Sequence, residues 1–189
     1  LSSNYTLYGD MSNRVASILR EFSPDIEVYS IDECFLRVET VDHLYGDATA
    51  MGQAMRRRIR QWTSLPVCAG FGESKTLAKL ANHLAKKNLV FDGVCDLTAL
   101  TDAQRQQWME KIEVGEVWGV GRKIAARLQT MGIQSVLDLA TADLKLIRRH
   151  FGVVLERTAS ELQGTSCLEL DDLADPKKQI MASRSFGAM

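Results

Sequence analysis

The stretch VYSIDECFLRV, from Val28 to Val38, contains two adjacent carboxylates in a run that is otherwise typical of β-strand. Its β-branched and aromatic residues favour strands, and packing alone gives no reason for Asp32 and Glu33 to stand there. Because neighbouring residues of a regular strand point to opposite faces, both carboxylates can serve one site only where the chain turns. We therefore predict two short strands within 26–38, with Asp32 and Glu33 at or beside the hairpin tip. The alternative is a solvated turn.

The composition is that of a folded chain with little overall charge. The 189 residues are 46% hydrophobic, which excludes pure disorder and allows one large domain or two small ones. Because 23 basic and 24 acidic residues give a net charge of -1, the basic footprint of a nucleic-acid binder must be sought locally. No apolar run approaches the roughly 20 residues of a membrane span, so we expect no membrane partner. The chain opens with Leu1 and not with Met, and we expect it to be a piece of a longer protein.

The cysteines and histidines show no metal-binding pattern. The four cysteines are far apart and form no Cys-x-x-Cys pair, which favours reduced thiols, buried as small hydrophobes, in a cytoplasmic protein. The three histidines, at positions 43, 83 and 150, have no ligand spacing either.

Apolar periodicity divides the chain into a mixed part and a helical part. Spacings of i, i+3, i+4 and i+7 predict helices over 11–22, 51–62 and 75–87. Further strands are expected over 66–71 and 93–97, the second closing the sheet. After Thr98, short helical patterns separated by glycines replace the β-branched clusters. We therefore predict an α+β unit over 1–97, an all-helical unit over 98–168, and an acidic linker over 169–189 that ends in the start of another domain.

The helix expected over 51–62 has an apolar face and a basic face. Its inward residues are predicted to be Met51, Met55, Ile59 and Trp62. Its arginines, at positions 56, 57, 58 and 60, resemble a nucleic-acid patch, but a solvated helix face is the favoured interpretation.

The stretch GFGESKTLAKLANHLAKK, over 70–87, predicts a strand, a glycine turn and a basic helix. At about 100° per residue, Lys75, Lys79 and Lys86 fall on one stripe opposite the leucines, so we expect them to face away from the core. A helix start preceded by glycines, with lysines in its first turns, suits phosphate groups. The alternative is a solvated lysine face. The P-loop motif is not matched, since it needs glycines where this chain has Ala69 and Ser74, which leaves a nucleotide-hydrolysing ATPase as the weakest alternative function.

The stretch VWGVGRKIAARLQTMGI, over 117–133, has the pattern of a helix-hairpin-helix. Glycines let the backbone approach a phosphate closely, the amides at the start of the second helix point at it, and cations add charge. Such contacts hold a duplex without reading bases, and they depend strongly on salt. The alternative is a plain helical hairpin. The candidate DNA-binding residues are Gly119, Gly121, Arg122, Lys123 and Arg127.

These motifs, in this order, resemble those of the Y-family of lesion-bypass DNA polymerases. YSIDECF is similar to the palm motif of that family, SKTLAKLANHLAKK to its triphosphate-binding helix, and VWGVGRKIAARLQTMGI to its thumb hairpin. More narrowly, SSNYTLYGDMSNRV and IRRHFGVVLERTASELQG are similar to the UmuC-like branch, which includes plasmid-borne members.

The resemblance implies a fold and a set of roles. The fold would be a partial polymerase palm, a mixed sheet with helices, followed by a small all-helical thumb with a helix-hairpin-helix. Asp32 and Glu33 would be catalytic ligands of two Mg²⁺ ions, and Lys79 and Lys75 would contact the phosphates of the incoming nucleotide. The third carboxylate, the fingers and the little finger belong to segments that we expect this piece to lack, so it should be inactive alone.

The implied activity is error-prone translesion DNA synthesis in the SOS response to DNA damage. The implied partners are primer-template DNA, deoxynucleoside triphosphates, a processed UmuD dimer, a RecA filament and the sliding clamp. The alternative function is a non-enzymatic helix-hairpin-helix DNA-binding module without a working metal site.

Overall fold

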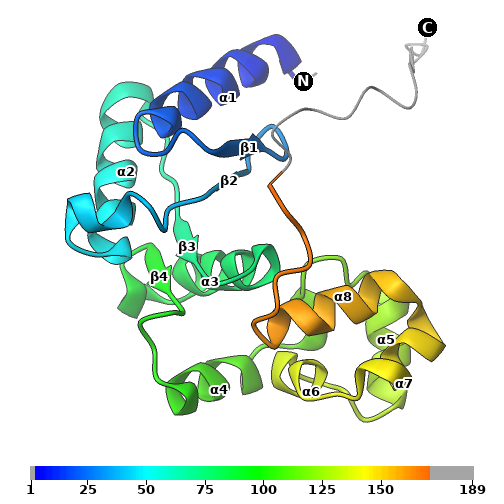
Figure 1. The fold of residues 1–189 in the computed structure, drawn as a ribbon. Helices are drawn as coiled ribbons and strands as arrows, with labels where there is room; N and C mark the ends of the chain where they lie inside the picture. Colours follow the sequence, from blue (N-terminus) through cyan, green and yellow to red (C-terminus); the bar gives the residue numbers. More distant parts are fainter. Residues whose placement is uncertain (1–2, 171–189) are drawn as a thin grey trace, which may run out of the picture.

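A computed structural model describes residues 3–170 (Figure 1). Its α-helices in this part of the chain are α1 (Tyr5–Arg20), α2 (Ala48–Thr63), α3 (Lys75–Lys87), α4 (Asp102–Glu110), α5 (Arg122–Thr130), α6 (Val136–Ala140), α7 (Leu144–Phe151) and α8 (Val153–Leu162). Its strands are β1 (Ile26–Val28), β2 (Cys34–Leu36), β3 (Ala69–Phe71) and β4 (Val94–Asp96). Short 3-10 turns occur at η1 (Asp42–Tyr45), η2 (Leu89–Phe91) and η3 (Val114–Glu116).

The strands pair in two separate ladders. β1 and β2 form the predicted antiparallel hairpin, with Glu27 opposite Phe35. β4 pairs in parallel with β3 and not with the hairpin. The mixed strand directions and the helices confirm the α+β class, but within residues 3–170 the strands make two small sheets and not one.

The two faces of the β1–β2 hairpin contact different helices. Ile26, Cys34 and Leu36 lie on one face and pack against a core shared by α1 and α2, which contains Ile18, Leu19, Phe22, Met51, Met55 and Ile59. Side chains alternate along a strand, so Glu27 and Phe35 lie on the other face. Both of them contact α3. The hairpin is therefore covered by helices on both sides.

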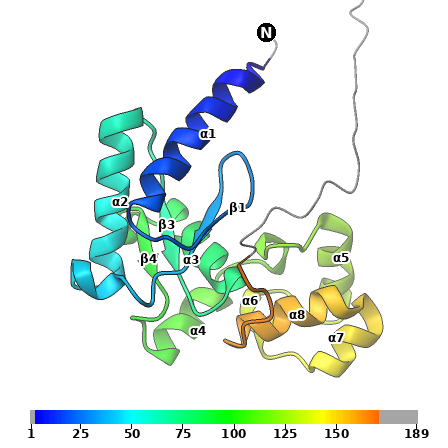
Figure 2. The ribbon, with the colours of Figure 1, turned by 45° about the horizontal axis from the view of Figure 1, so that its top comes forward.

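A second core joins α3 to the helical part of the chain. It runs from Leu77 of α3, through Val114 and Leu128, to Leu162 at the end of α8. In both views α3 lies between the α1–α2 pair and the group formed by α5 to α8 (Figures 1 and 2). The division of the chain at residue 97 stays a prediction, since this core extends across it.

The helix bounds agree best where a cap residue precedes the apolar pattern. α3 begins and ends as predicted, because Ser74 caps it and accepts a hydrogen bond from the Leu77 amide at 3.2 Å. α1 begins at Tyr5, well before the predicted start at residue 11, since Asn4 caps an extra stretch whose large apolar side chains are exposed.

Two predictions about α2 are wrong. The side chain of Trp62 is 54% exposed, because the α1–α2 core ends at Ile59 and the indole lies instead under the Arg58 guanidinium, 5.0 Å from it. Arg56 is not on a solvated face. Its Nε donates to the Val67 carbonyl at 2.8 Å and its Nη1 donates to the Asp92 carbonyl, so it ties α2 to the loops around β3 and β4.

The cysteines are free thiols, and burial differs among them. Cys95 is buried, and burial, with a smaller effect of Asp96, raises its pKa to about 12. Cys34, Cys68 and Cys167 are only partly buried.

No helix within residues 3–170 is long and apolar enough to cross a membrane. The linker and domain start predicted over 169–189 lie almost wholly outside the described residues.

A close backbone contact holds α3 against β3. A Cβ at Gly70 would lie 2.1 Å from the Asn82 amide nitrogen and 2.5 Å from the Ala78 carbonyl oxygen. Gly70→Ala must therefore push α3 away, and we expect it to lower the free energy of unfolding by at least about 2–3 kcal/mol. Urea denaturation measures this loss.

Gly9→Ala is the matched control for Gly70→Ala. Gly9 lies in α1, and an added Cβ meets nothing within 4 Å there. We expect this variant to be more stable by about 0.5–1 kcal/mol, through helix propensity alone. Equal effects of the two substitutions would contradict the close contact.

Candidate nucleotide and DNA site

The acidic pair lies in the turn that joins β1 to β2, as predicted. The amides of Tyr29 and Ser30 both donate to the Glu33 carbonyl, at 3.0 and 3.1 Å, and so close the turn. Asp32 is exposed, and its Oδ1 accepts a hydrogen bond from the Ser30 hydroxyl at 2.8 Å. Glu33 is partly buried and faces α3. The two carboxylates thus share one tip but have different surroundings.

Lys75 and Lys79 face away from the leucines of α3, as predicted, but the hairpin covers them. Lys75 forms an ion pair with Glu27 of β1, and Lys79 forms one with Glu33 of the turn. Their side chains are only 10% and 22% exposed. The pattern within the helix could not show this, because the hairpin covers the stripe from about 46 residues earlier in the chain. Of the predicted stripe, Lys86 is exposed.

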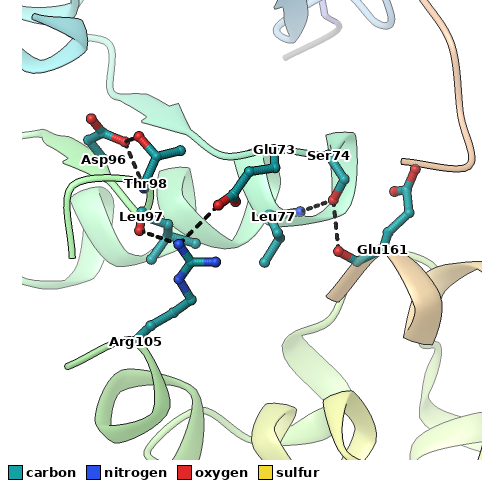
Figure 3. A network of polar contacts seen from close by, with 8 residues as sticks. All are labelled: Glu73, Ser74, Leu77, Asp96, Leu97, Thr98, Arg105 and Glu161. Atoms are coloured by element: carbon teal, nitrogen blue, oxygen red, sulfur yellow. Dashed lines mark hydrogen bonds and ion pairs between the residues drawn. The ribbon is translucent and has the colours of Figure 1, made fainter. Parts of the chain in front are cut away.

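Glu161 of α8 lies at the start of α3, beside Ser74 (Figure 3). The Ser74 hydroxyl, which caps α3, also donates to the Glu161 carbonyl at 3.0 Å. The Thr76 amide donates to the Glu161 carboxylate at 3.0 Å. This amide is therefore not open to a phosphate, and any phosphate contact of α3 falls to its lysine side chains.

Glu161 is a fully buried carboxylate with hydrogen bonds to both oxygens. Its side chain is 0% exposed. One oxygen accepts from the amide and the hydroxyl of Thr76, and the other from the amides of Cys167 and Leu168 at 3.1 and 3.0 Å. Glu161 therefore joins α8, α3 and the segment that follows α8. The sequence analysis missed this residue.

The donors at the hairpin tip fit magnesium in type but not in number. Carboxylate oxygens are the ligands that Mg²⁺ prefers, and Asp32 and Glu33 supply them from one turn. Within residues 3–170, however, no group of three or more His, Cys, Asp or Glu side chains could hold a metal ion. Glu33 also has Lys79 as its partner, with which a metal ion would compete.

The predicted DNA-binding turn has two glycines of different kinds. Gly119 has a φ of +85°, which favours glycine for backbone reasons. Gly121 has an ordinary φ of -77°, and an added Cβ would meet nothing within 4 Å. No feature of the described residues requires glycine at 121, which leaves room for close approach of an outside group to the backbone.

The start of α5 lacks the side-chain cap that most helices here possess. Six of the eight α-helices of residues 3–170 have an N-cap residue whose side chain accepts a hydrogen bond from an amide of the first turn. The N-cap residues of α5 and α8 are glycines, Gly121 and Gly152. Arg122 and Lys123 follow Gly121 and are exposed.

Arg127 makes contacts within the fold that Arg122 and Lys123 do not share. One of its Nη atoms donates to the His150 carbonyl at 3.0 Å, and its guanidinium lies 4.8 Å from the centre of the Phe151 ring. It therefore joins α5 to the end of α7, and the structure brings only part of the predicted DNA-binding set to the open turn.

The fold is that of solved polymerase structures. The insertion ternary complex of Dbh DNA polymerase superposes with a TM-score of 0.69 at 23% identity, over 86% of this chain and 46% of that one. The described residues therefore share the fold of the matching part of that polymerase.

The sequence comparisons show which proteins this chain resembles. Residues 1–83 match the impB/mucB/samB family, and residues 102–133 match the IMS family HHH motif. The chain is 49% identical to protein UmuC of Salmonella typhimurium over 98% of its length, and 33% identical to DNA polymerase IV of Moorella thermoacetica over 79%. The aligned part of the chain covers 44% of the length of this UmuC and 36% of the length of this DNA polymerase IV. Residues 1–83 therefore have the sequence pattern of the impB/mucB/samB family, and the similarity to protein UmuC extends over almost the whole chain.

The buried carboxylate of Glu161 gives a prediction about stability. Glu161→Ala leaves the buried amide and hydroxyl of Thr76 without their partner, so we expect the free energy of unfolding to fall by about 2–4 kcal/mol. The control is Glu156→Ala on the same helix, which breaks an ion pair with the exposed Arg148. That change should cost less than about 1 kcal/mol in chemical denaturation. Similar losses in both variants would show that Glu161 is not a clamp.

Proposed function

We propose that this protein is an error-prone translesion DNA polymerase of the SOS response to DNA damage. The observation that carries the proposal is the hairpin tip, where Asp32 and Glu33 stand together and Lys79 of α3 reaches Glu33. In this proposal residues 1–97 are the palm, 98–168 the thumb, and 169–189 lead to a further domain. A relative that is 33% identical to this chain is a DNA polymerase IV.

The chemistry would be transfer of a nucleotide to a primer end. Bound Mg²⁺ ions would lower the pKa of the primer hydroxyl and neutralise charge on the triphosphate. Asp32 and Glu33 would supply oxygen ligands from this chain, and further ligands would have to come from outside the described residues. Lys79 and Lys75 would bind phosphate oxygens as point charges. For this, Lys79 would exchange its carboxylate partner for a phosphate.

The thumb would bind the duplex through its backbone. The unexplained glycine at 121, the uncapped start of α5 and the exposed Arg122 and Lys123 together suit a phosphate group. Contacts of this kind position a duplex and carry no sequence information.

A second candidate is a non-enzymatic DNA-binding module. It is favoured by one observation, the lack of a three-ligand metal group within residues 3–170. It would keep the thumb turn and lose the chemistry. Measurement of nucleotide incorporation by the complete gene product decides between the two.

The location and the protein partners remain predictions. We place the protein in the cytoplasm, where thiols stay reduced, as suits its free cysteines. Primer-template DNA and deoxynucleoside triphosphates are the proposed substrates. Binding of a processed UmuD dimer, a RecA filament and the sliding clamp stays a prediction from the resemblance.

Replacing the tip carboxylates tests the proposed chemistry. In the complete gene product, Asp32→Asn and Glu33→Gln should each lower the rate of nucleotide incorporation by about 100-fold or more, because each weakens the binding of the Mg²⁺ that would neutralise charge on the triphosphate. Affinity for primer-template DNA should stay within about twofold. The control is Glu39→Gln, an exposed carboxylate beyond β2. Near-normal primer extension by either tip variant would refute the assignment.

A salt series tests the thumb turn. Because a phosphate contact releases about 0.9 counterion, the Arg122→Ala/Lys123→Ala variant should flatten the plot of log affinity against log salt by at most about two units. Fluorescence anisotropy with two unrelated duplexes should give the same change for both. Arg57→Ala/Arg60→Ala, which removes two exposed cations from α2, should leave the slope unchanged. A strong preference for one duplex, or an equal effect of both pairs, would contradict a backbone clamp at the turn.

A further inference from the structure

Trp118 of the thumb turn packs against the acidic hairpin. Its ring lies 5.3 Å from that of Tyr29 in an edge-to-face arrangement, and 5.7 Å from that of Phe35. The Tyr29 and Phe35 rings are themselves 5.7 Å apart. The three aromatic side chains therefore form one cluster between the hairpin and the chain that leads to Gly119, in the geometry that aromatic pairs prefer.

The ammonium group of Lys79 lies on this cluster. Its Nζ is 5.6 Å from the centre of the Trp118 ring and 5.7 Å from that of Tyr29, within the range of a cation–π interaction. The same ammonium is paired with Glu33. Two rings and one carboxylate thus define the place of a long side chain that would otherwise adopt many rotamers.

The other α3 lysine has a different set of neighbours. Lys75 is paired with Glu27 and lies over Phe35, at 5.3 Å from the ring centre. Both of these partners come from the hairpin. Lys79 alone has a partner from the thumb, so a shift of the turn at Gly119 would act on Lys79 and not directly on Lys75.

Simple core packing does not account for Trp118. Its side chain is only partly buried, whereas the neighbours Val117 and Val120 are buried and fill the core beneath α5. Trp108 shows what a tryptophan at the margin of that core does: it packs on Phe91, with Lys111 over its ring at 5.0 Å and no hairpin residue among its ring contacts.

We propose that Trp118 is a positioning residue that holds the Lys79 ammonium, together with Tyr29, where it can meet the triphosphate of an incoming nucleotide. The proposal rests on the phosphate-binding role given to Lys79 in the proposed function. It adds a thumb residue to the nucleotide site, and it makes the place of Lys79 depend on the chain segment that carries the DNA-binding turn.

The first test measures geometry without any ligand. Ring currents of Trp118 and Tyr29 shift the NMR signals of the Lys79 ε-methylene group upfield. Trp118→Leu should remove a large part of this shift, Trp118→Phe should keep more of it, and Trp108→Phe should leave it unchanged. Trp118→Phe also serves if the leucine variant does not fold. An unchanged Lys79 signal in both Trp118 variants would overturn the proposal.

The second test measures triphosphate binding in the complete gene product. With deoxyguanosine triphosphate and magnesium as the probe, Trp118→Leu should weaken binding by about three- to tenfold, the scale of a lost cation–π contact. Lys79→Ala with Trp118→Leu should bind no more weakly than Lys79→Ala alone, because the two residues act as one unit. Additive losses would overturn the proposal. Failure of Lys79→Ala itself to weaken binding would refute the nucleotide role of Lys79, while the NMR test still decides what Trp118 does.

Discussion

An ammonium group removed from water needs a carboxylate beside it, and this requirement fixes the hairpin on α3. Lys75 and Lys79 are largely covered, and burial of an unpaired charge costs several kcal/mol. Glu27 and Glu33 meet that need from alternate positions of the hairpin, on the face that α1 and α2 do not cover. Glu33 thus faces α3 from the turn, one residue before β2, while Asp32, its neighbour, stays in solvent.

Glu161 imposes a similar constraint at the other side of α3. A carboxylate without solvent contact needs several donors, and it obtains them from Thr76 and from the chain after α8. The start of α3, the end of α8 and the outgoing segment are thus joined by one side chain. Together with the shared core, this makes α3 the element on which the hairpin and the helical part are both mounted.

Local sequence signals were sufficient to predict the helices and strands. The contacts of the site residues depend on segments far apart in the chain, which these signals do not reveal. The glycine turn and the leucine period predicted the bounds of α3, and the Asp-Glu pair in a strand-forming run predicted the hairpin. The helix pattern predicted that the lysine stripe faces away from the core, but it does not reveal which distant segment covers Lys75 and Lys79. The prediction that Trp62 faces the core failed for the opposite reason, since no segment within residues 3–170 covers its side chain.

Trp118 and Glu161 were missed, although each gave a weak signal. Glu161 falls with Leu162 on the inward face of α8, where a carboxylate is out of place unless donors meet it. Trp118 is a large aromatic residue directly before a glycine turn. Neither signal indicates the distant partners, which are Thr76, about 85 residues before Glu161, and the hairpin for Trp118.

At position 121, a side chain that stabilises the start of α5 would weaken the proposed binding of a phosphate. An aspartate or serine there would satisfy the amides that begin α5, as side chains do at six other helices, and nothing in the described fold stands in its way. The same oxygen would occupy, and an aspartate would also repel, the anion that those amides are proposed to hold. Laboratory selection for heat resistance alone would therefore favour a capping side chain at this position, whereas selection for affinity to a DNA duplex would favour glycine.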